Sequence, residues 1–595
     1  MILSAIELSP ELRGQRGPTM GTLVRRYLRP HITGLTMLGA FLLATTLLRL
    51  VAPLIIRSFI DLARGGADGG TLTRTAVLYL LAVVAAQVIA VADAVVASGI
   101  AWRATNRLRN DLFLHCLRLD LPFHHSNSPG VMVERIDGDV ETLQNLFSHF
   151  VVRLAGNVLL LLGVLTVMLA VDWRLGIYTI LFTVVVLLVL RAVRNISVSP
   201  WGRQRETSAE MVGYLEEALT STEDIRANGA EIHAIRSFQG RSREMRSATV
   251  RALLGVGLIA GLTTAMFQPG IAGALGVATI LLEHHQLTLG TVFLVFNYAL
   301  LLTQPLEELG RQLQDLQSAG AGATRVAELL ATRSTLPEAP AADRLGEGGP
   351  LALVFDRVTF AYGDGEPALR HITFELPAGE SLGVIGRTGS GKTTLARLAL
   401  RLYDPSVGAV VVGGRDVRTI PTAELRARVA LVPQEVQLLH ATVRNNITLF
   451  DHSITDERVR QALEDLNIGR VGNRGEGGLN EVLAAGGVDL SGGEAQLLAL
   501  ARAFLLNPGL VVLDEASSRV DPATEQALEG AMDRLLAGRT AVVIAHRLST
   551  LQRVDRILVL EEGRVVEVGR RAELAADPGS HLARLLRGDL SEALL

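Results

Sequence analysis

Long runs of hydrophobic positions dominate the first half of the chain, and each run is far longer than a buried strand. About 20 apolar residues span the hydrocarbon core of a bilayer, so runs of this length predict membrane-crossing helices. They are also too long for the strands of a membrane barrel. The six predicted spans are residues 30–60, 75–102, 154–171, 175–190, 252–282 and 284–306.

The polar connections between these runs alternate in length. Two of them, residues 103–153 and 191–251, are long and charged, and the segment before residue 30 is also rich in Arg. Because Arg collects on the cytoplasmic side of membrane proteins, this pattern places all three segments in the cytoplasm. Apolar residues recur at helical spacing in the long connections, which predicts helices that continue about 35 Å beyond the bilayer.

Charged residues interrupt the predicted spans at Arg49, Arg57 and Asp93. A charge at mid-bilayer costs about 2.5–3.5 kcal/mol on insertion scales, so each is expected to face a partner or a cavity. The favoured interpretation is an ion pair between Arg49 and Asp93, and the alternative is contact with a substrate. Glu307 and Glu308, at the end of the sixth span, are expected to be solvated.

The second half of the chain has a different pattern. Residues 321–350 end in Pro-, Ala- and Gly-rich sequence and are interpreted as a linker. Residues 351–590 then alternate short strand-like and helix-like runs, which is typical of an α/β domain. The predicted organisation is a cytoplasmic segment (1–30), a six-helix membrane domain with cytoplasmic extensions (31–320), the linker and the α/β domain.

Composition agrees with a membrane protein. Hydrophobic residues make up 49% of the chain, charged residues only 20%, and the mean hydropathy is +0.33. The 57 Lys+Arg and 60 Asp+Glu nearly cancel, which gives no electrostatic basis for nucleic-acid binding. One cysteine, Cys116, excludes a disulfide framework and a CxxC redox motif.

Only one of the basic residues is a lysine, Lys392, and it lies in a P-loop pattern between an apolar run and a helix-like run. In such a loop, backbone N–H groups and the N-terminus of the following helix bind phosphate. The lysine contacts the β- and γ-phosphates, and the Thr393 hydroxyl ligates Mg²⁺. The residues assigned to this phosphate site are Gly386, Arg387, Thr388, Gly389, Ser390, Gly391, Lys392, Thr393 and Thr394.

A second acidic motif follows the apolar run of residues 510–513. Asp514 is expected at the C-terminal end of a buried strand, where open α/β sheets bind ligands, and it can hold Mg²⁺ through water. Glu515 is then placed to orient or polarise the attacking water. An Asp-Glu pair after an apolar run is a weak signal alone, but it becomes strong together with a P-loop.

Between these two motifs lies Leu490-Ser491-Gly492-Gly493-Glu494-Ala495-Gln496, which resembles the signature motif of ATP-binding cassette (ABC) proteins. The two glycines expose backbone N–H groups at a helix start, which forms a second phosphate cradle. The resemblance implies that Ser491, Gly492 and Gly493 bind the ATP held by an opposite subunit.

Four more residues match the family in order along the chain. Tyr362 resembles the aromatic residue that stacks on adenine, and Gln434 resembles the glutamine that contacts Mg²⁺ and water. Asp521 lies in a segment that resembles the loop at the dimer interface, and His546 resembles the histidine that holds the γ-phosphate. The resemblance thus implies ATP and Mg²⁺ as cofactors. It assigns catalysis to Glu515, His546, Gln434 and Lys392, and the metal to Thr393, Gln434 and Asp514.

Six spans followed by one such domain resemble the half-transporter exporters of this superfamily. The implied fold is an α-helical membrane domain of the ABC exporter type followed by an α/β P-loop nucleotide-binding domain. The implied location is a cell membrane, with the nucleotide-binding domain cytoplasmic. Two coupling helices are expected, near Leu121–Pro129 and near Tyr214–Ala227. One departure is Ala484–Gly487, where the family usually has a Gly-Glu-x-Gly run; the acidic residue is absent, which leaves the transmission of coupling open.

The resemblance implies ATP-driven export by alternating access. One domain cannot present both faces of a composite ATP site to itself, so the chain is expected to pair with an identical or paralogous half-transporter. The expected substrate is amphipathic, drug-like or peptide-like. The alternatives are a lipid flippase, one subunit of a heterodimeric exporter, and a regulatory subunit, against which the presence of Glu515 and His546 argues.

Overall fold

The structure is a computed structural model and divides into two compact units. One unit comprises Met1–Arg118 and Ser128–Arg333, and the other comprises Leu119–Asn127 and Ser334–Leu595. The residues described are 20–146, 151–193, 195–339, 344–346, 348–363, 365–472, 477–484, 490–514, 522–545 and 551–587.

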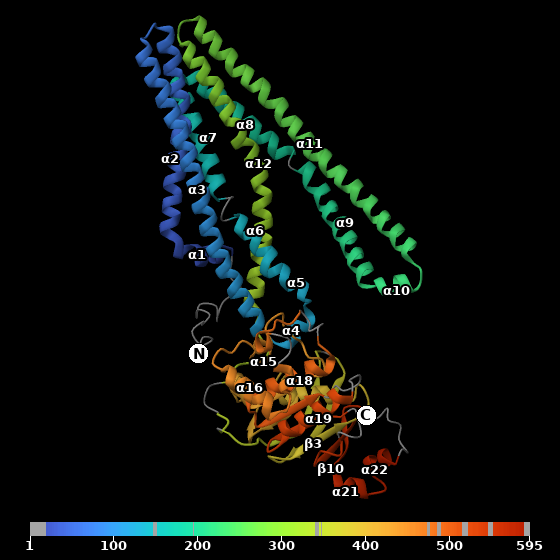
Figure 1. The fold of residues 1–595 in the computed structure, drawn as a ribbon. Helices are drawn as coiled ribbons and strands as arrows, with labels where there is room; N and C mark the ends of the chain where they lie inside the picture. The colour runs from blue at the N-terminus through green and yellow to red at the C-terminus, as the bar shows by residue number, and fades with distance from the viewer. Residues whose placement is uncertain are drawn as a thin grey trace. The chain divides into compact units, whose positions relative to one another are not determined.

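The first unit is built of helices, several of which are very long (Figure 1). The π-helix η4 (Glu134–Gly138) lies between two short helices, and η3 (Arg29–His31) precedes the first long helix. The α-helices of this unit are α1 (Met20–Leu28), α2 (Ile32–Arg64), α3 (Gly69–Arg118), α5 (Pro129–Val133), α6 (Asp139–Asn145), α7 (Val151–Val171), α8 (Trp173–Val193), α9 (Asn195–Thr220), α10 (Thr222–Ala227), α11 (Glu231–Glu283) and α12 (Leu289–Ala331).

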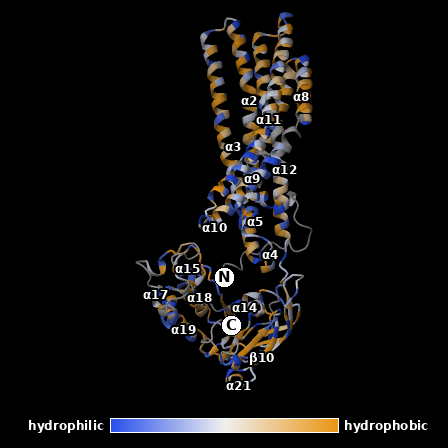
Figure 2. Cartoon of the chain, turned by 90° about the vertical axis from the view of Figure 1, so that its right-hand side faces the viewer, coloured by the Kyte–Doolittle hydropathy of each residue, from blue (hydrophilic) through white to orange (hydrophobic). Residues whose placement is uncertain are grey.

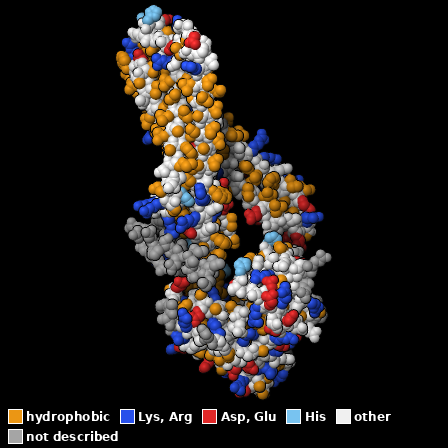
Figure 3. Space-filling model, turned by 60° about the vertical axis from the view of Figure 1, so that its left-hand side comes forward, with side chains coloured by type: hydrophobic (Ala, Val, Ile, Leu, Met, Phe, Trp, Pro, Cys, Tyr) orange, Lys and Arg blue, Asp and Glu red, His pale blue; other side chains and the backbone are white. Residues whose placement is uncertain are grey.

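Apolar side chains gather in a broad band on the long helices, on the face shown in Figure 3, and Figure 2 colours long stretches of these helices as hydrophobic, as expected for a surface that faces lipid. By length and composition, five helical stretches of the described residues can cross a membrane. The predicted span 175–190 lies in α8, whose apolar stretch Trp173–Val189 is shorter. The prediction of a helical membrane domain is confirmed. The five stretches are Gly21–Arg64, Gly69–Arg118, Leu154–Val171, Thr264–Glu283 and Leu289–Leu306.

Helices α2 and α12 are joined at two levels. The Tyr298 hydroxyl, fully buried, donates to the carbonyl of Leu50 at 2.7 Å. Where α2 ends and α12 begins, the carboxylate of Asp61 accepts hydrogen bonds from the Thr288 hydroxyl at 2.7 Å and from the Gly290 N–H at 2.9 Å. These contacts fix the register of the two helices against each other.

The ion pair expected between Arg49 and Asp93 is not found among the described residues. Arg49 is exposed, whereas one carboxylate oxygen of Asp93 is buried and has no hydrogen-bond partner in the part of the chain that the structure describes. The register of the two helices explains this difference, because Gly34 packs against Ile100. That contact puts Arg49 about eight residues, or about 12 Å, from the level of Asp93.

The expectation of a merely solvated Glu308 is also wrong. Its carboxylate accepts a hydrogen bond from the Asn157 amide on α7 at 2.7 Å and another from the Gln304 amide at 3.2 Å. An acid near the end of a membrane helix is stabilised by such donors, because they replace part of its lost hydration. Glu308 therefore links α7 to α12.

The long charged connections are helical, as the spacing predicted. Helix α3 continues to Arg118, and α9 and α11 form a hairpin that turns at α10. The hairpin is held by the Tyr214 hydroxyl, which donates to the Ala234 carbonyl at 3.1 Å, and by Arg241 over the Tyr214 ring. The two positions proposed for coupling helices carry the short helices α4 (Leu121–Ser126) and α10.

The second unit contains two sheets. The four-stranded sheet has the order β2-β1-β4-β5 and is antiparallel, and the six-stranded sheet has the order β10-β9-β3-β8-β7-β6 and is parallel except for β10. The strands are β1 (Leu353–Ala361), β2 (Pro367–Leu376), β3 (Ser381–Ile385), β4 (Val407–Val412), β5 (Arg415–Asp416), β6 (Val429–Val432), β7 (Leu510–Asp514), β8 (Thr540–Ile544), β9 (Arg556–Glu561) and β10 (Arg564–Arg570).

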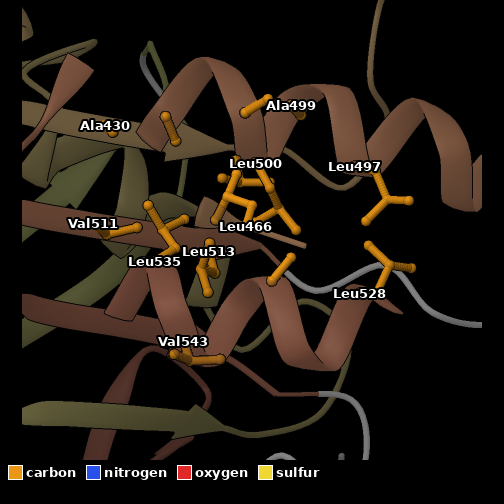
Figure 4. Packing of buried hydrophobic residues seen from close by; sticks show 14 of the residues in the cluster. Ala430, Leu466, Leu497, Ala499, Leu500, Val511, Leu513, Leu528, Leu535 and Val543 are labelled. Carbon is orange, nitrogen blue, oxygen red and sulfur yellow. The ribbon is translucent and has the colours of Figure 1, made fainter. Parts of the chain in front are cut away.

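Helices cover the parallel sheet, and its central strands are apolar on both faces, as buried parallel strands are. Figure 4 shows α18 and α19 packed on one face, with Leu500 and Leu535 directed toward Val511 and Leu513. The helices of this unit are α4, α13 (Lys392–Ala399), α14 (Thr422–Arg428), α15 (Val443–Thr448), α16 (Asp456–Asp465), α17 (Gly469–Gly472), the 3₁₀ helix η6 (Gly478–Asn480), α18 (Gly492–Leu506), α19 (Pro522–Leu536), α21 (Arg571–Ala576) and α22 (His581–Leu586).

Candidate functional site

The loop between β3 and α13 needs glycine at two positions. Gly386 has φ +154°, and a Cβ there would lie 2.1 Å from the carbonyl oxygen of Leu560. Gly391 has φ +106°, and a Cβ there would lie 2.5 Å from the side chain of Leu369. The loop is thus wrapped tightly against neighbouring strands, while residues 387–389 remain exposed. This geometry leaves backbone N–H groups available at the start of α13.

Lys392 is buried at the first position of α13, with 6% of its surface exposed. Its ammonium group donates to the carbonyl oxygens of Gly386 and Arg387, within the loop that precedes it. Burial lowers the pKa of Lys392, and the negative charge of Asp514 opposes that shift. A buried ammonium that bonds to loop carbonyls is positioned to exchange those contacts for phosphate oxygens.

Ser390 provides the most direct sign that the loop is suited to an anionic ligand. Its side chain is buried, with 4% of the residue exposed, and its hydroxyl has no hydrogen-bond partner among the described residues. A buried hydroxyl without a partner is costly, so the loop is arranged for a ligand oxygen at that point. The residues present therefore fit a phosphate group.

Two oxygen ligands come together at the C-terminal edge of the parallel sheet. The hydroxyl of Thr393 and a carboxylate oxygen of Asp514, at the end of β7, lie 3.4 Å apart. A hydroxyl and a carboxylate beside a phosphate cradle are the ligand types that Mg²⁺ takes in phosphate sites, with water completing its shell. This donor set fits the metal that sequence analysis assigned to these two residues.

Tyr362 is the only aromatic residue that sequence analysis assigned to the site, and it lies just after β1. Its ring makes edge contacts with Phe360 and Tyr403, with centroids 4.8 Å and 5.2 Å away, and 37% of the residue is exposed. Its hydroxyl is 3.0 Å from the hydroxyl of Thr394 on α13. The ring is therefore supported from behind and tied to the helix that carries the lysine.

Arg397 is a contact that sequence reasoning missed. Its guanidinium donates to the Tyr362 hydroxyl at 3.2 Å. The signal for it was the spacing of three residues from Thr394, which puts both side chains on one face of α13. Arg397 and Thr394 together hold the aromatic ring beside the loop.

The signature residues form the N-terminus of α18. Ser491 is its N-cap: the hydroxyl accepts from the Glu494 N–H at 3.2 Å, and the Glu494 carboxylate accepts from the Ser491 N–H at 2.9 Å. Among the described residues, no atom lies within 4 Å of a Cβ built at Gly492, whereas Gly493 is buried. The open glycine and the fixed serine leave the positive end of a 15-residue helix accessible to an anion.

Not every predicted residue is brought into this group. Gln434 is exposed in the segment after β6. Glu515, Asp521 and His546 lie outside the described residues. The structure thus gathers Lys392 and its neighbours in the loop, and the assignments of the other four remain predictions.

Comparison with known proteins agrees with this geometry. Residues 35–306 match the family described as the ABC transporter transmembrane region, and residues 369–518 match the ABC transporter family. A fatty acid ABC transporter ATP-binding/permease protein of Mycobacterium tuberculosis is 30% identical over 88% of this chain and 83% of its own length. An ATP-dependent lipid A-core flippase of Salmonella typhimurium is 30% identical over 81% of this chain and 83% of its own length.

The fold has a close counterpart among solved structures. A bacterial Atm1-family ABC exporter with ATP bound superimposes with a TM-score of 0.80 and 25% sequence identity, and the match covers 96% of this chain and 99% of that one. The family matches and the fold match agree, and together they include the phosphate loop, the signature helix and the membrane helices. This chain is a member of the ABC transporter family, an exporter half-transporter in which the membrane domain and the ATP-binding domain are fused.

Proposed function

We propose that the chain hydrolyses ATP and uses it to export an amphipathic or lipid-like compound, working as a dimer of two identical copies. The observation that carries this proposal is the group around Lys392: the Ser390 hydroxyl has no hydrogen-bond partner among the described residues, and the Thr393 hydroxyl lies 3.4 Å from the Asp514 carboxylate. These are the contacts that phosphoryl transfer requires for charge neutralisation.

The dimer follows from the arrangement of the phosphate-binding features. The N-terminus of α18 at Gly492 is open and suits a phosphate group. A nucleotide on the loop before Lys392 would already be bound by the N-terminus of α13, so the N-terminus of α18 is available to a nucleotide held by another subunit. In the ABC family, the signature residues bind the ATP of the opposite subunit. Two copies related by a two-fold axis would complete both sites with the same surfaces.

The α9–α11 hairpin supports a second subunit as well. Leu215 and Leu219 near the end of α9 and Ile232 and Ile235 near the start of α11 are 42–66% exposed. These residues lie about 25–45 Å along the helices from the predicted spans, beyond the reach of lipid tails. An apolar surface in that position is best covered by protein, here a second copy of the chain.

In this proposal, ATP draws the two nucleotide-binding domains together, and the long helices transmit closure to the membrane domain. Asp514 and Thr393 would hold Mg²⁺, with Gln434 as a further ligand, and the metal would neutralise charge on the phosphates. Glu515 would orient the attacking water, and His546 would hold the γ-phosphate. Hydrolysis removes the ligand that favours the closed state, so the domains separate.

The proposed substrate class rests on the relatives and on the spans. The relatives are described as a fatty acid transporter and a lipid A-core flippase. Both substrates are amphiphiles with an anionic group. Lipid flipping across the membrane is therefore the second candidate function. The chain would lie in the cell membrane with its nucleotide-binding domain in the cytoplasm, as its Arg-rich connections indicate.

The test is ATP hydrolysis by the purified chain in lipid nanodiscs, with Glu515→Gln as the matched variant. Turnover by the wild type that the substitution abolishes, with ATP binding retained, supports a catalytically competent homodimer. Well-folded wild-type protein that binds ATP without turnover would contradict the homodimer and would direct the search to a paralogous subunit. Stimulation by added lipid, but not by drug-like cations, would favour the flippase.

A further inference from the structure

Arg401 connects the end of the P-loop helix to the linker. It lies two residues after the end of α13, has φ +50°, and only 1% of it is exposed. Its guanidinium donates to the carbonyl of Pro337 in the linker at 2.8 Å and to the carbonyl of Ile420 at 3.2 Å, and it contacts the Asp404 carboxylate at 3.1 Å. A buried arginine held by three partners is rigid, so Pro337 is fixed to the C-terminal end of α13.

Asp120 connects the linker to the first intracellular turn. One of its carboxylate oxygens accepts from the Phe123 N–H at 3.2 Å and so caps the N-terminus of α4. The other accepts from the Ser334 hydroxyl at 3.1 Å, from the Thr335 hydroxyl at 2.7 Å and from the Thr335 N–H. Only 7% of Asp120 is exposed. A single carboxylate thus joins two segments that lie more than 200 positions apart in the chain.

The electrostatics of Asp120 agree with a fixed anion. Burial alone would raise its pKa, but the hydrogen bonds from Thr335, Phe123 and Ser334 outweigh burial and hold the pKa below its usual range. The carboxylate is therefore charged at neutral pH, and each of its four hydrogen bonds is charge-assisted and strong. Leu121, the next residue, packs against the apolar cluster beneath the antiparallel sheet.

These contacts lie where the chain passes between its two compact units. The units divide after Arg118 and again after Arg333, next to Asp120 and Ser334. Within the helical unit, one turn before these points, the His115 imidazole is 2.9 Å from the carbonyl of Leu329. The ends of α3 and α12 are thus held together in one unit, and the segments that continue them are held together in the other.

We propose that residues 334–337 form a relay that transmits the position of the P-loop helix to α3 and α12 together, with Arg401 and Asp120 as its positioning residues. Movement of α13 displaces Pro337 through Arg401, and Asp120 makes the first intracellular turn follow the same displacement. Without the Asp120 contacts, a displacement of the linker would be transmitted only to α12, which it continues, and not to α3. This relay rests on the proposed function, because it assigns a route by which ATP binding reaches the membrane domain.

The experiment measures ATP hydrolysis and membrane-domain movement separately. A spin label at His284→Cys, in the exposed turn between α11 and α12, is placed on a Cys116→Ser background, so that a homodimer carries one label per copy. Asp120→Asn is compared with Thr335→Val, which removes one hydroxyl and leaves the backbone donor in place. Ser126→Ala is the matched control, because its hydroxyl makes local contacts only among the described residues: it donates to the Phe123 carbonyl at 2.9 Å and accepts from the Asn127 amide at 3.0 Å.

In nanodiscs with ATP, Mg²⁺ and vanadate, we expect the wild type to show a new inter-label distance. In Asp120→Asn, the ratio of molecules with the new distance to molecules with the original distance should fall by about ten-fold. The NH2 group of asparagine cannot accept the hydrogen bonds that a carboxylate oxygen of Asp120 accepts. ATP hydrolysis should stay within about three-fold of the wild type, because no group at the phosphates is changed. Thr335→Val should show a smaller effect in the same direction, and Ser126→Ala none.

Two results would overturn the relay. The first is that Asp120→Asn shows the same change in inter-label distance as the wild type. The second is that Asp120→Asn loses ATP hydrolysis together with the distance change, which would mean that the contact only stabilises the fold. Failure of the proposed function is recognised differently, because the wild type itself would then neither hydrolyse ATP nor change its inter-label distance.

Discussion

The hydroxyl of Thr393 and the carboxylate of Asp514 lie 3.4 Å apart, although 121 positions separate them in the chain. They meet because the strand β3 that leads into α13 and the strand β7 that ends in Asp514 are parallel and flank β8. The C-terminal ends of parallel strands open on the same edge of a sheet. The topology thus places the two residues proposed to bind Mg²⁺ beside the loop proposed to bind phosphate.

Asp514→Asn is expected to separate nucleotide binding from catalysis. The amide keeps the shape of the side chain but removes the charge that holds Mg²⁺, so ATP hydrolysis should fall by at least about 100-fold. ATP binding in the presence of EDTA should be unchanged, whereas the gain in affinity on adding Mg²⁺ should disappear. Titration of ATP by fluorescence, with and without Mg²⁺, checks both points. An unaltered Mg²⁺ effect would contradict the metal assignment.

Lys392→Met is expected to stabilise the nucleotide-free protein while abolishing ATP binding. Burial lowers the pKa of Lys392, so the charged form is disfavoured in the folded state. A cation with a lowered pKa destabilises the fold at pH values below both its folded and unfolded pKa. This cost vanishes as the pH rises above the ordinary lysine value. Thermal unfolding should therefore show a raised Tm for Lys392→Met at neutral pH, and no difference from wild type in strongly alkaline buffer.

The same unfolding experiment contains its own control for function. ATP should raise the Tm of the wild type, since a ligand that binds only the folded state stabilises it, and should leave Lys392→Met unchanged. A variant with a lowered Tm that still responds to ATP would contradict the role given to this lysine.

Gly386→Ala is expected to damage the loop more than Gly389→Ala. Both glycines have positive φ, but a Cβ at Gly386 would lie 2.1 Å from the Leu560 carbonyl, whereas no atom lies within 4 Å of one at Gly389. Backbone strain of this kind costs about 1–3 kcal/mol, and the clash with Leu560 adds to it. Urea unfolding and ATP binding measure the two effects. Equal losses of stability and ATP affinity in the two variants would mean that the close contact with the Leu560 carbonyl is unimportant.

Tyr362→Phe and Tyr362→Ala should differ in ATP affinity. The ring is held by edge contacts with Phe360 and Tyr403 and is the surface proposed for adenine. Stacking of a base on an aromatic ring contributes about 1–3 kcal/mol, so the alanine variant should bind ATP about ten-fold or more weakly. The phenylalanine variant loses only the hydroxyl contacts to Thr394 and Arg397 and should bind nearly as well. Binding of inorganic triphosphate, which has no base, should be the same in all three proteins.

Leu219→Glu is expected to weaken the dimer. This residue is 66% exposed on the α9–α11 hairpin, where a second copy is proposed to cover it. A buried carboxylate without a partner opposes association strongly. Glu216→Gln, on the same helix, is the control. Mass photometry of nanodiscs at low protein concentration should show more monomer for Leu219→Glu alone, and equal dimer fractions would argue against this surface.

The phosphate site was predictable because its residues are local in sequence or follow strands of recognisable pattern. The glycines before Lys392 and Asp514 at the end of β7 have positions fixed by backbone geometry, and the fold brings them together as expected. The membrane helices were predictable from apolar length alone. The absence of an Arg49–Asp93 pair was not, because the register of two apolar helices depends on close packing, here Gly34 against Ile100.

The linker contacts were also invisible in the sequence. Asp120 lies in a polar turn with no motif around it, and Ser334 and Thr335 belong to the segment that sequence analysis interpreted only as a linker. Their hydrogen bonds join residues more than 200 positions apart, and no local spacing reports such a distance. Arg401 is one of 57 basic residues in the chain and is distinguished only by its complete burial.

Lys392 gives the protein an unusual chemical property. Apart from the α-amino group of the chain, its amine is the single primary amine in 595 residues, and it lies in the proposed nucleotide site. Acylating reagents such as succinimidyl esters, and proteases that cut only after lysine, therefore have one side-chain target. Because Lys392 is only 6% exposed, the rate at which such reagents modify it would report how often the loop opens, in detergent or in native membranes, without any engineered label.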